Sequence, residues 1–268
     1  MTAVGTAAAR LHVLTAMSAP MAVVLRRGPA GKVASLGWNR ATGEVTLGQW
    51  LAGRIYEYRC DLSPDGRHMV YFAARQSRAA GHRCWTAVSR APYLRAIAFQ
   101  PQVDTWGGGG AFTADGALWP GWPGEIGDGL RAAAPSAFPP STDGVFTGDT
   151  HGARLRLRGW RHLGGESSAA RHGRDQPGGG LLEHSYALSQ PNRAIGSSIH
   201  HLALPGQARA ATGWEWADLW GDQMQFASGG ALWQAQLIDG QTDAPKLIHD
   251  FNPLKFHPVP DPYQGLPA

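Results

Sequence analysis

Hydrophobic and polar residues alternate over short stretches of this chain, and turns rich in glycine and proline separate the stretches. Residues 21–28 (MAVVLRRG), 33–39 (VASLGWN) and 43–51 (GEVTLGQWL) have the composition and short length of β-strands. The second and third stretches flank the turn Asn39-Arg40-Ala41-Thr42-Gly43, so we predict that they form a β-hairpin.

A second pair of strands is predicted on either side of the turn Ser63-Pro64-Asp65-Gly66. In such a turn proline presets φ, aspartate bonds back to the main chain, and glycine takes a positive φ. Residues 54–62 (RIYEYRCDL) precede the turn, and the strongly β-prone residues 68–75 (HMVYFAAR) follow it. Looser versions of the same turn recur at residues 113–116, 141–144, 220–222 and 238–240.

Repeated hairpins with little helix indicate a β-sandwich, a barrel or a propeller. The step from Gly66 to Gly116 is 50 residues, which is close to the roughly 40–50 residues of a propeller blade. We therefore predict an all-β fold, a small propeller of about five blades of antiparallel strands. The expected blades are residues 21–55, 56–98, 99–145, 146–195 and 196–260. Residues 17–268 would form this single domain, with residues 1–16 a flexible extension or the product of a misassigned start codon.

Two segments resemble a known repeat. The sequence DLSPDGRHMVYFAAR (61–75) resembles the repeat of the TolB-like, or PD40, β-propellers, which is centred on Ser63-Pro64-Asp65-Gly66. Residues 216–237 resemble a degraded copy with Asp222 at the turn. The resemblance implies a propeller fold and a tendency to bind partners at the face of the disc, and it implies no activity.

Composition supports the fold and narrows the setting. The 36 Gly and 19 Pro leave little room for long helices, and the 11 Trp suit pleated, half-buried surfaces. Cys60 and Cys84 match no zinc spacing, so we expect free, buried thiols in a reducing compartment. Because no stretch of about 18 apolar residues occurs, we expect a cytoplasmic protein without membrane contact. The net charge of +4 is modest and does not by itself indicate nucleic acid.

The familiar catalytic motifs are absent from the sequence: there is no nucleophile elbow, P-loop, HExxH pattern or dinucleotide-binding glycine pattern. A binding function agrees with this absence. We expect Arg54, Glu57, Arg90 and Trp106 to lie on one face of the propeller, because the order of strands and loops permits it. Trp106 precedes four glycines, among which Gly108 and Gly109 could expose main-chain N–H groups to an anion or let a ligand approach closely. The alternative, which the pattern favours, is a bulge or tight crossover of two backbone segments with Trp106 packed beside it.

Two histidines are candidate metal ligands. His200 and His201 are adjacent on a predicted strand, so their side chains would point to opposite faces and only one could enter a common site. We expect no cofactor, and the alternative, a divalent metal site, would need three or four ligands. The further ligands would come from residues such as His151, His162, His184, Asp218 and His249.

Three segments complete the prediction. Arg154-Leu155-Arg156-Leu157-Arg158 alternates as an outer β-strand would, with its arginines on one face in contact with solvent. Residues 124–144 and 166–184 are rich in small residues without a period and are predicted to be long surface loops.

Three functions remain open. The first, which we favour, is a binding module that presents loops and a channel mouth to a protein or a small ligand. The second is a metal-dependent hydrolase or lactonase-like enzyme with ligands around the channel. The third is an accessory subunit of a larger assembly.

Overall fold

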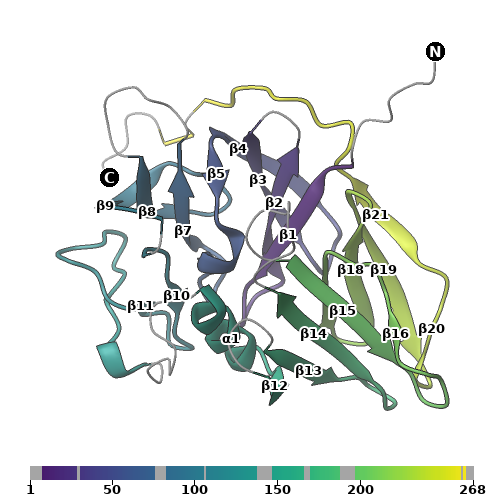
Figure 1. Cartoon of the computed structure of the whole chain (residues 1–268). Helices are drawn as coiled ribbons and strands as arrows, with labels where there is room; N and C mark the ends of the chain where they lie inside the picture. The colour runs from purple at the N-terminus through teal and green to yellow at the C-terminus, as the bar shows by residue number, and fades with distance from the viewer. Residues whose placement is uncertain are drawn as a thin grey trace.

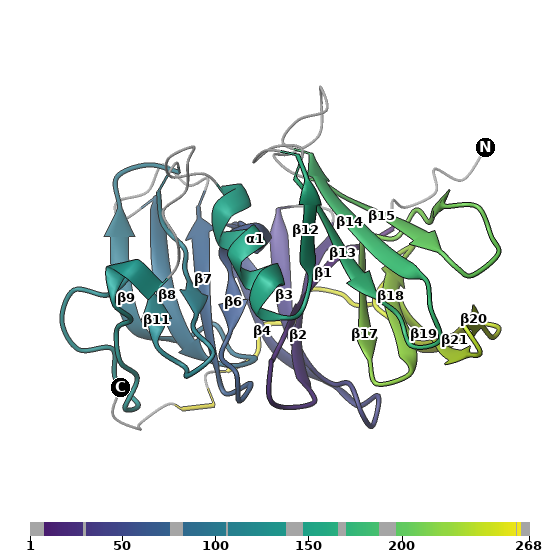
Figure 2. The ribbon, with the colours of Figure 1, turned by 90° about the horizontal axis from the view of Figure 1, so that it is seen from below.

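The structure is a computed structural model that describes residues 8–28, 31–75, 83–105, 107–137, 147–165, 170–187, 197–260 and 262–263. It is built mainly from antiparallel β-sheets that surround a central region (Figures 1 and 2). Among the described residues, no helix combines the length and the apolar character that crossing a bilayer requires.

The first two sheets follow one another along the chain. The first contains β1 (Arg10–Thr15), β2 (Met21–Gly28), β3 (Lys32–Asn39) and β4 (Val45–Ala52) in that order. The second contains β5 (Arg54–Ile55), β6 (Asp61–Leu62), β7 (His68–Ala74), β8 (Cys84–Arg90) and β9 (Ala96–Gln102). The hairpin predicted around Asn39–Gly43 is confirmed as β3 and β4, and Gly43 has a φ of 79° there.

A small sheet and a helix separate these sheets from the next two. The small sheet pairs β10 (Ala111–Phe112) with β11 (Leu118–Trp119). The 3-10 helix η2 (Pro135–Ala137) and the α-helix α1 (Thr147–Leu157) follow. The third large sheet contains β12 (Arg161–Gly164), β13 (Arg171–Asp175), β14 (Leu181–Ala187), β15 (Ser197–Ala203) and β16 (Ala210–Ala211). The fourth contains β17 (Trp216–Trp220), β18 (Gln223–Ser228), β19 (Ala231–Ile238), β20 (Gln241–Thr242) and β21 (Lys246–Asp250).

The four large sheets form a propeller-like arrangement, so the all-β, propeller-like prediction is confirmed. The described residues make four blades rather than about five. The difference lies at residues 99–145, where a full blade was expected and the two-residue strands β10 and β11 are found. In the described part of this region, glycines and prolines are frequent around these two strands, and such residues disfavour longer strands.

The prediction of a flexible extension at residues 1–16 is wrong for residues 10–15, which form the strand β1. Five of its six residues are buried. β1 also joins the two ends of the chain. The Ala9 amide donates to Asn252 Oδ1 at 2.9 Å, and the Leu11 amide donates to Glu215 Oε2 at 2.6 Å. Residues 1–7 lie outside the described residues.

Three local predictions also need correction. The segment Arg154–Arg158 lies in and just after the helix α1 and is not a strand. Residues spaced by four share a helix face, and both Arg154 and Arg158 donate to main-chain carbonyls of the first two sheets. The expected strand over residues 54–62 is broken by the 3-10 helix η1 (Glu57–Arg59). Part of the expected loop at 166–184 forms β13 and the start of β14.

Hydrophobic clusters fill the spaces between neighbouring sheets. One cluster joins the first and second sheets through Leu25, Ile55 and Tyr71. Another joins the first and fourth sheets, where the rings of Trp38 and Trp216 meet edge to face with centroids 6.0 Å apart. This packing holds the sheets around a common centre, where α1 lies between β6 and β12 (Figure 2).

Candidate functional site

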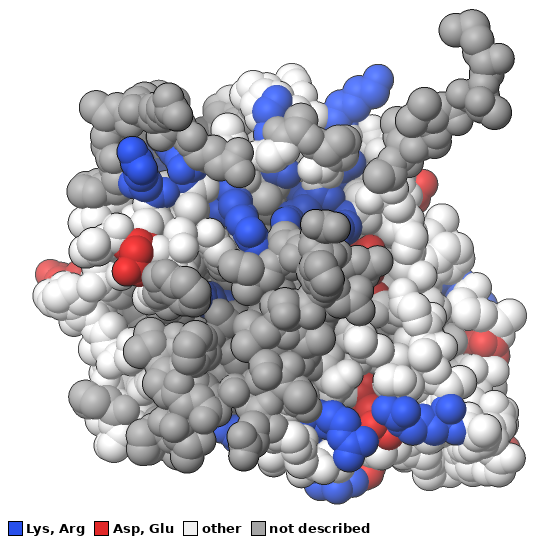
Figure 3. All heavy atoms as spheres, in the orientation of Figure 1, with Lys and Arg blue, Asp and Glu red and all other residues white. Residues whose placement is uncertain are grey.

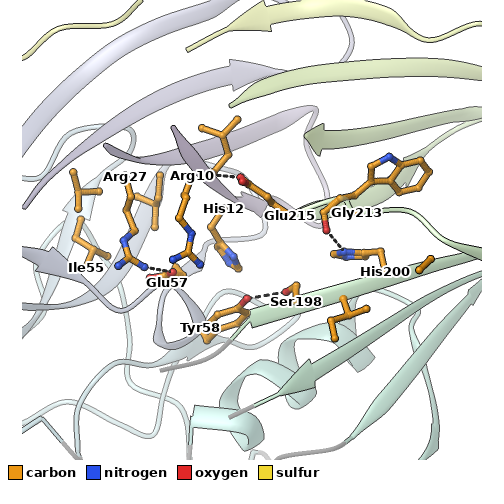
Figure 4. A pocket seen from close by; sticks show the side chains of 16 residues that line it. Arg10, His12, Arg27, Ile55, Glu57, Tyr58, Ser198, His200, Gly213 and Glu215 are labelled. Atoms are coloured by element: carbon orange, nitrogen blue, oxygen red, sulfur yellow. Dashed lines mark hydrogen bonds and ion pairs between the residues drawn. The ribbon is translucent and has the colours of Figure 1, made fainter. Parts of the chain in front are cut away.

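A cavity of about 620 Å³, which we call the outer cavity, lies between elements of the first, second and third large sheets (Figure 4). It is bounded by β1, β2, β3, β5, η1, β15, β16 and the residues before β17, so all of the large sheets except the fourth contribute directly. Its polar lining residues are Arg10, His12, Arg27, Glu57, Tyr58, Ser198, His200 and Glu215. A smaller void of about 40 Å³, the inner cavity, shares His12, Ser198 and His200 with it and extends to α1.

Two arginines stand side by side on one wall of the outer cavity. Arg10 and Arg27 are direct partners in the register of β1 and β2, and like charges in that relation destabilise a sheet. Glu57 compensates one of them, because its Oε1 lies 2.8 Å from Arg27 Nη1. Arg10 forms no hydrogen bond or ion pair with another described residue, and its guanidinium points into the cavity near Glu57 (Figure 4).

A hydroxyl group with two polar neighbours lies on the opposite side. Ser198 Oγ is 2.8 Å from the Tyr58 hydroxyl and 2.9 Å from His184 Nε2. Ser198 and His200 are two residues apart on β15 and therefore share one face of the strand. His200 donates from Nδ1 to the Trp214 carbonyl at 3.1 Å. Its Nε2 is therefore an acceptor, and it has no partner among the described residues.

A row of histidines crosses the third sheet toward the cavity. The register pairs His162 with His172, His172 with His184, and His184 with His200. The row runs from the exposed His162 on β12 to His200 at the cavity wall. The ring centroids of His184 and His200 are 5.0 Å apart.

Arg154 in α1 and Arg158 just after it line the inner cavity. The Arg154 guanidinium donates to His151 Nδ1 at 2.8 Å and to the Cys60 carbonyl. Arg158 pairs with the fully buried Asp61 at 2.7 Å. Burial lowers the pKa of Arg154 to about 10, so its side chain stays charged at neutral pH.

The histidines around the two cavities are neutral at neutral pH. Burial lowers the pKa of His200 to about 4. Burial, followed by the charge of Arg154, holds the pKa of His12 and of His151 well below its ordinary value. For His184 the cause is again burial, with further contributions from neighbouring histidines and Arg154.

The fixed charges at the two cavities are close to balanced. Two arginines and two carboxylates line the outer cavity. At the inner cavity Arg158 pairs with Asp61, and Asp218 binds Arg40 and Arg174 from outside the cavities. Burial raises the pKa of Glu215, whereas the charge of Arg10 acts in the opposite direction. On the face shown in Figure 3, Lys and Arg side chains gather around β1, β2 and β5, where few Asp and Glu side chains are visible.

The contact between Ser198 and His184 also has the spacing of a nucleophile and its base. A base of this kind must become an imidazolium ion, which a neighbouring carboxylate usually stabilises. The groups that act on His184 electrostatically are three histidines and Arg154, and each of them disfavours the protonated ring. The arrangement therefore suits hydrogen bonding to a bound molecule better than proton abstraction.

The residues that the sequence suggested for ligand binding are not gathered in one place. Glu57 lines the outer cavity. Arg54 lies opposite Ala74 at one end of β7, and Arg90 lies opposite His68 at the other end. Seven residues of a strand span about 20 Å, so Arg54 and Arg90 do not share a face. Arg90 binds Asp128 instead, through two hydrogen bonds of 2.6 Å.

The glycine-rich segment lies beside the second sheet. Gly108 has a φ of 90°, and a side chain there would meet the ring of Phe72 at 2.6 Å. The Gly109 amide donates to Thr86 Oγ1 at 2.8 Å, and a side chain at Gly109 would meet the Arg59 main chain. These two glycines thus permit close packing within the blade. Trp106 lies outside the described residues.

The two candidate metal ligands separate as their adjacency on the strand required. His200 faces the outer cavity, and His201 lies opposite Glu183 in the register of β14 and β15. Within the described ranges, no group of three or more His, Cys, Asp or Glu side chains has the arrangement to hold a metal ion.

Sequence reasoning missed most of the outer cavity. Arg10 and His12 alternate with Leu11 and Val13, which is the signal of a strand with one polar face, but they fall in the segment set aside as an extension. Ser198 was also missed, although its spacing of two from His200 places both on one face. Arg27 and Glu215 carried no local signal.

Comparisons with known proteins do not assign the chain to a family. No protein-family model matches it, and no curated protein matches it. Among solved structures, an uncharacterised protein from Listeria monocytogenes is similar at 7% identity and a TM-score of 0.29, with 89% of this chain and 66% of that one covered. A structure from work on prolyl endopeptidases is similar at 12% identity and a TM-score of 0.34, with 89% of this chain and 42% of that one covered. The chain thus spans less than two thirds of each.

Proposed function

We propose that the protein is a binding module that holds a small molecule in the outer cavity. The observation that carries the proposal is the convergence of charged and hydroxyl groups from separate sheets on one cavity of about 620 Å³. Pockets for small ligands typically have volumes of about 300–1,000 Å³ and a few well-placed polar groups. The resemblance of residues 61–75 to TolB-like repeats agrees with a binding role.

A small molecule explains the site better than a protein partner does. The polar groups lie inside a concave space, and His12, Glu57 and His200 are each less than 10% exposed. A folded protein surface would not reach them. A small ligand with both donors and acceptors can reach these groups and satisfy them, which offsets the cost of their burial.

The other two functions, a metal-dependent hydrolase and an accessory subunit, remain predictions that no comparable arrangement of residues supports. The surroundings of His184 give no advantage to a metal-dependent hydrolase. The accessory-subunit alternative needs a partner surface, and the two most exposed large apolar side chains, Val103 just after β9 and Ile238 at the end of β19, belong to different parts of the fold.

The proposal can be tested with a fluorine label at the rim of the outer cavity. Ile199 lines the cavity and is 38% exposed, so an Ile199→Cys variant can carry a trifluoromethyl thiol tag. Cys60 and Cys84 are at most 2% exposed, and burial raises the pKa of both thiols, so the tag should react at position 199. A library of anionic, neutral and cationic compounds is then screened by ¹⁹F NMR.

A tag on Val103→Cys, next to β9 and fully exposed, serves as the control. We expect some compounds to shift the resonance at position 199 in a saturable way and to leave the control resonance unchanged. If no compound of any charge class does so, the proposal of a small-molecule site is wrong.

A further inference from the structure

The wall of the outer cavity formed by β1 and β2 can bind one negatively charged group of a ligand. Arg10 and Arg27 are paired across β1 and β2, and Glu57 compensates the second of them. The Arg10 guanidinium forms no ion pair with a described residue, although its charge acts on Glu215. Guanidinium groups bind carboxylate and phosphate through paired hydrogen bonds. An oxyanion beside Arg10 would also relieve the repulsion between the two arginines.

The other polar residues that line the outer cavity favour uncharged hydrogen-bonding groups on the ligand. His200 Nε2 and the carboxylates of Glu57 and Glu215 are acceptors, so a second negative charge near them would be repelled. Ser198 both donates and accepts. Hydroxyl groups can serve all of these partners, because each hydroxyl donates one hydrogen bond and accepts others.

The group that can bind an anion and the groups that can bind hydroxyls lie on different sides of the cavity. Arg10 lies on the β1–β2 wall, whereas Ser198 and His200 lie on β15 across the cavity (Figure 4). A bare oxyanion would occupy only one side of a space of about 620 Å³. A ligand that reaches both walls must carry its anionic group at one end and its hydrogen-bonding groups along the remainder.

We infer that the ligand of the outer cavity is a polyhydroxylated oxyanion, such as a sugar phosphate or a sugar acid. Its anionic group binds Arg10, and its hydroxyl groups bind Ser198, His200 and the acidic side chains. The inference rests on the proposed function, because it assigns a ligand class to the same cavity.

The test is isothermal titration calorimetry of the full chain with matched probes. The panel contains several sugar phosphates and sugar acids, the parent sugar of each, and inorganic phosphate. We expect at least one charged member to bind more than tenfold tighter than its parent sugar and than inorganic phosphate. Replacing Arg10 by Gln should remove this advantage, since one ion-paired hydrogen bond corresponds to about a tenfold change in affinity.

Two variants make the outcome specific. Arg131→Gln is the matched control, because Arg131 is exposed, pairs with Asp115 and lies outside the cavity. It should leave the affinities unchanged. Ser198→Ala should weaken the charged probe and its parent sugar by the same factor, because it acts on the hydroxyl-bearing part alone.

Three results would overturn the inference: no charged member binds better than its parent sugar, the advantage survives Arg10→Gln, or Arg131→Gln removes it equally. These failures are distinguishable from failure of the proposed function. A cavity that takes neutral or cationic compounds would still shift the fluorine tag at position 199, whereas an empty structural cavity would shift it with no compound.

Discussion

Acid should destabilise this protein well above the pH at which carboxylates titrate. Four histidines around the two cavities, His12, His151, His184 and His200, are no more than 6% exposed, and burial is the largest cause of the lowered pKa of each. In the unfolded chain a histidine has a pKa of about 6.5. Below that pH the unfolded state takes up protons that the folded state cannot accept, so the free energy of unfolding falls as the pH falls.

The size of the effect follows from the shift itself. One histidine that stays neutral in the folded state lowers the free energy of unfolding by about 1.3 kcal/mol between pH 7.5 and pH 5.5. The pKa of His200, about 4, lies below this window, so its full effect applies there. Four such histidines give about 5 kcal/mol, a large part of the stability of an ordinary domain. At about 2 °C per kcal/mol for a chain of this length, Tm should fall by about 10 °C.

Thermal unfolding followed by circular dichroism at pH 7.5 and pH 5.5, at constant ionic strength, measures this fall. In His200→Gln the fall should be smaller by about a quarter, whatever the stability of the variant at pH 7.5. His257→Gln, at an exposed position, should behave as the unmodified chain does. A Tm that differs by less than about 2 °C between the two pH values would refute the reasoning, because it would mean that the folded protein protonates these rings freely.

Two further predictions concern stability. Arg40 is 3% exposed and donates three hydrogen bonds to the fourth sheet, so Arg40→Met should cost about 3 kcal/mol and lower Tm by about 6 °C. Arg161→Met, at an exposed ion pair, should change Tm by less than about 2 °C. Gly66→Ala should destabilise more than Gly116→Ala in chemical denaturation. Both positions have a positive φ, but an added carbon at Gly66 would lie 2.5 Å from Met21 Cβ, whereas nothing lies within 4 Å at Gly116. Equal losses would mean that backbone strain alone decides the effect.

Local signals in the sequence sufficed for the strands that a defined turn connects. The turn Ser63–Gly66 has the expected hydrogen bonds, with Ser63 Oγ 2.6 Å from Asp65 Oδ1 and the Gly66 amide donating to the Ser63 carbonyl. Proline, aspartate and glycine act there within four residues, so their effect needs no tertiary information. The same holds for the hairpin around Asn39, whose side chain accepts a hydrogen bond from the Ala41 amide.

Segments whose structure depends on distant contacts were predicted less well. The alternation Arg154–Arg158 fits both a strand and a helix over five residues, and contacts with Cys60 and Thr15 accompany the helix. The outer cavity could not be assembled from the sequence for the same reason. Its walls pair Leu11 with Glu215 and Tyr58 with Ser198, which are separated by 204 and 140 residues.

The meeting of the two chain ends has a consequence for biosynthesis. Ala9 binds Asn252, a residue 243 positions later. A ribosome that adds about 5–20 residues per second needs roughly 12–50 s to make that interval. β1 must therefore remain without this neighbour for at least that time. The pair formed by Leu11 and Glu215 is delayed in the same way, so the outer cavity is complete only after Glu215 has been synthesised, and a nascent chain cannot hold its ligand before then.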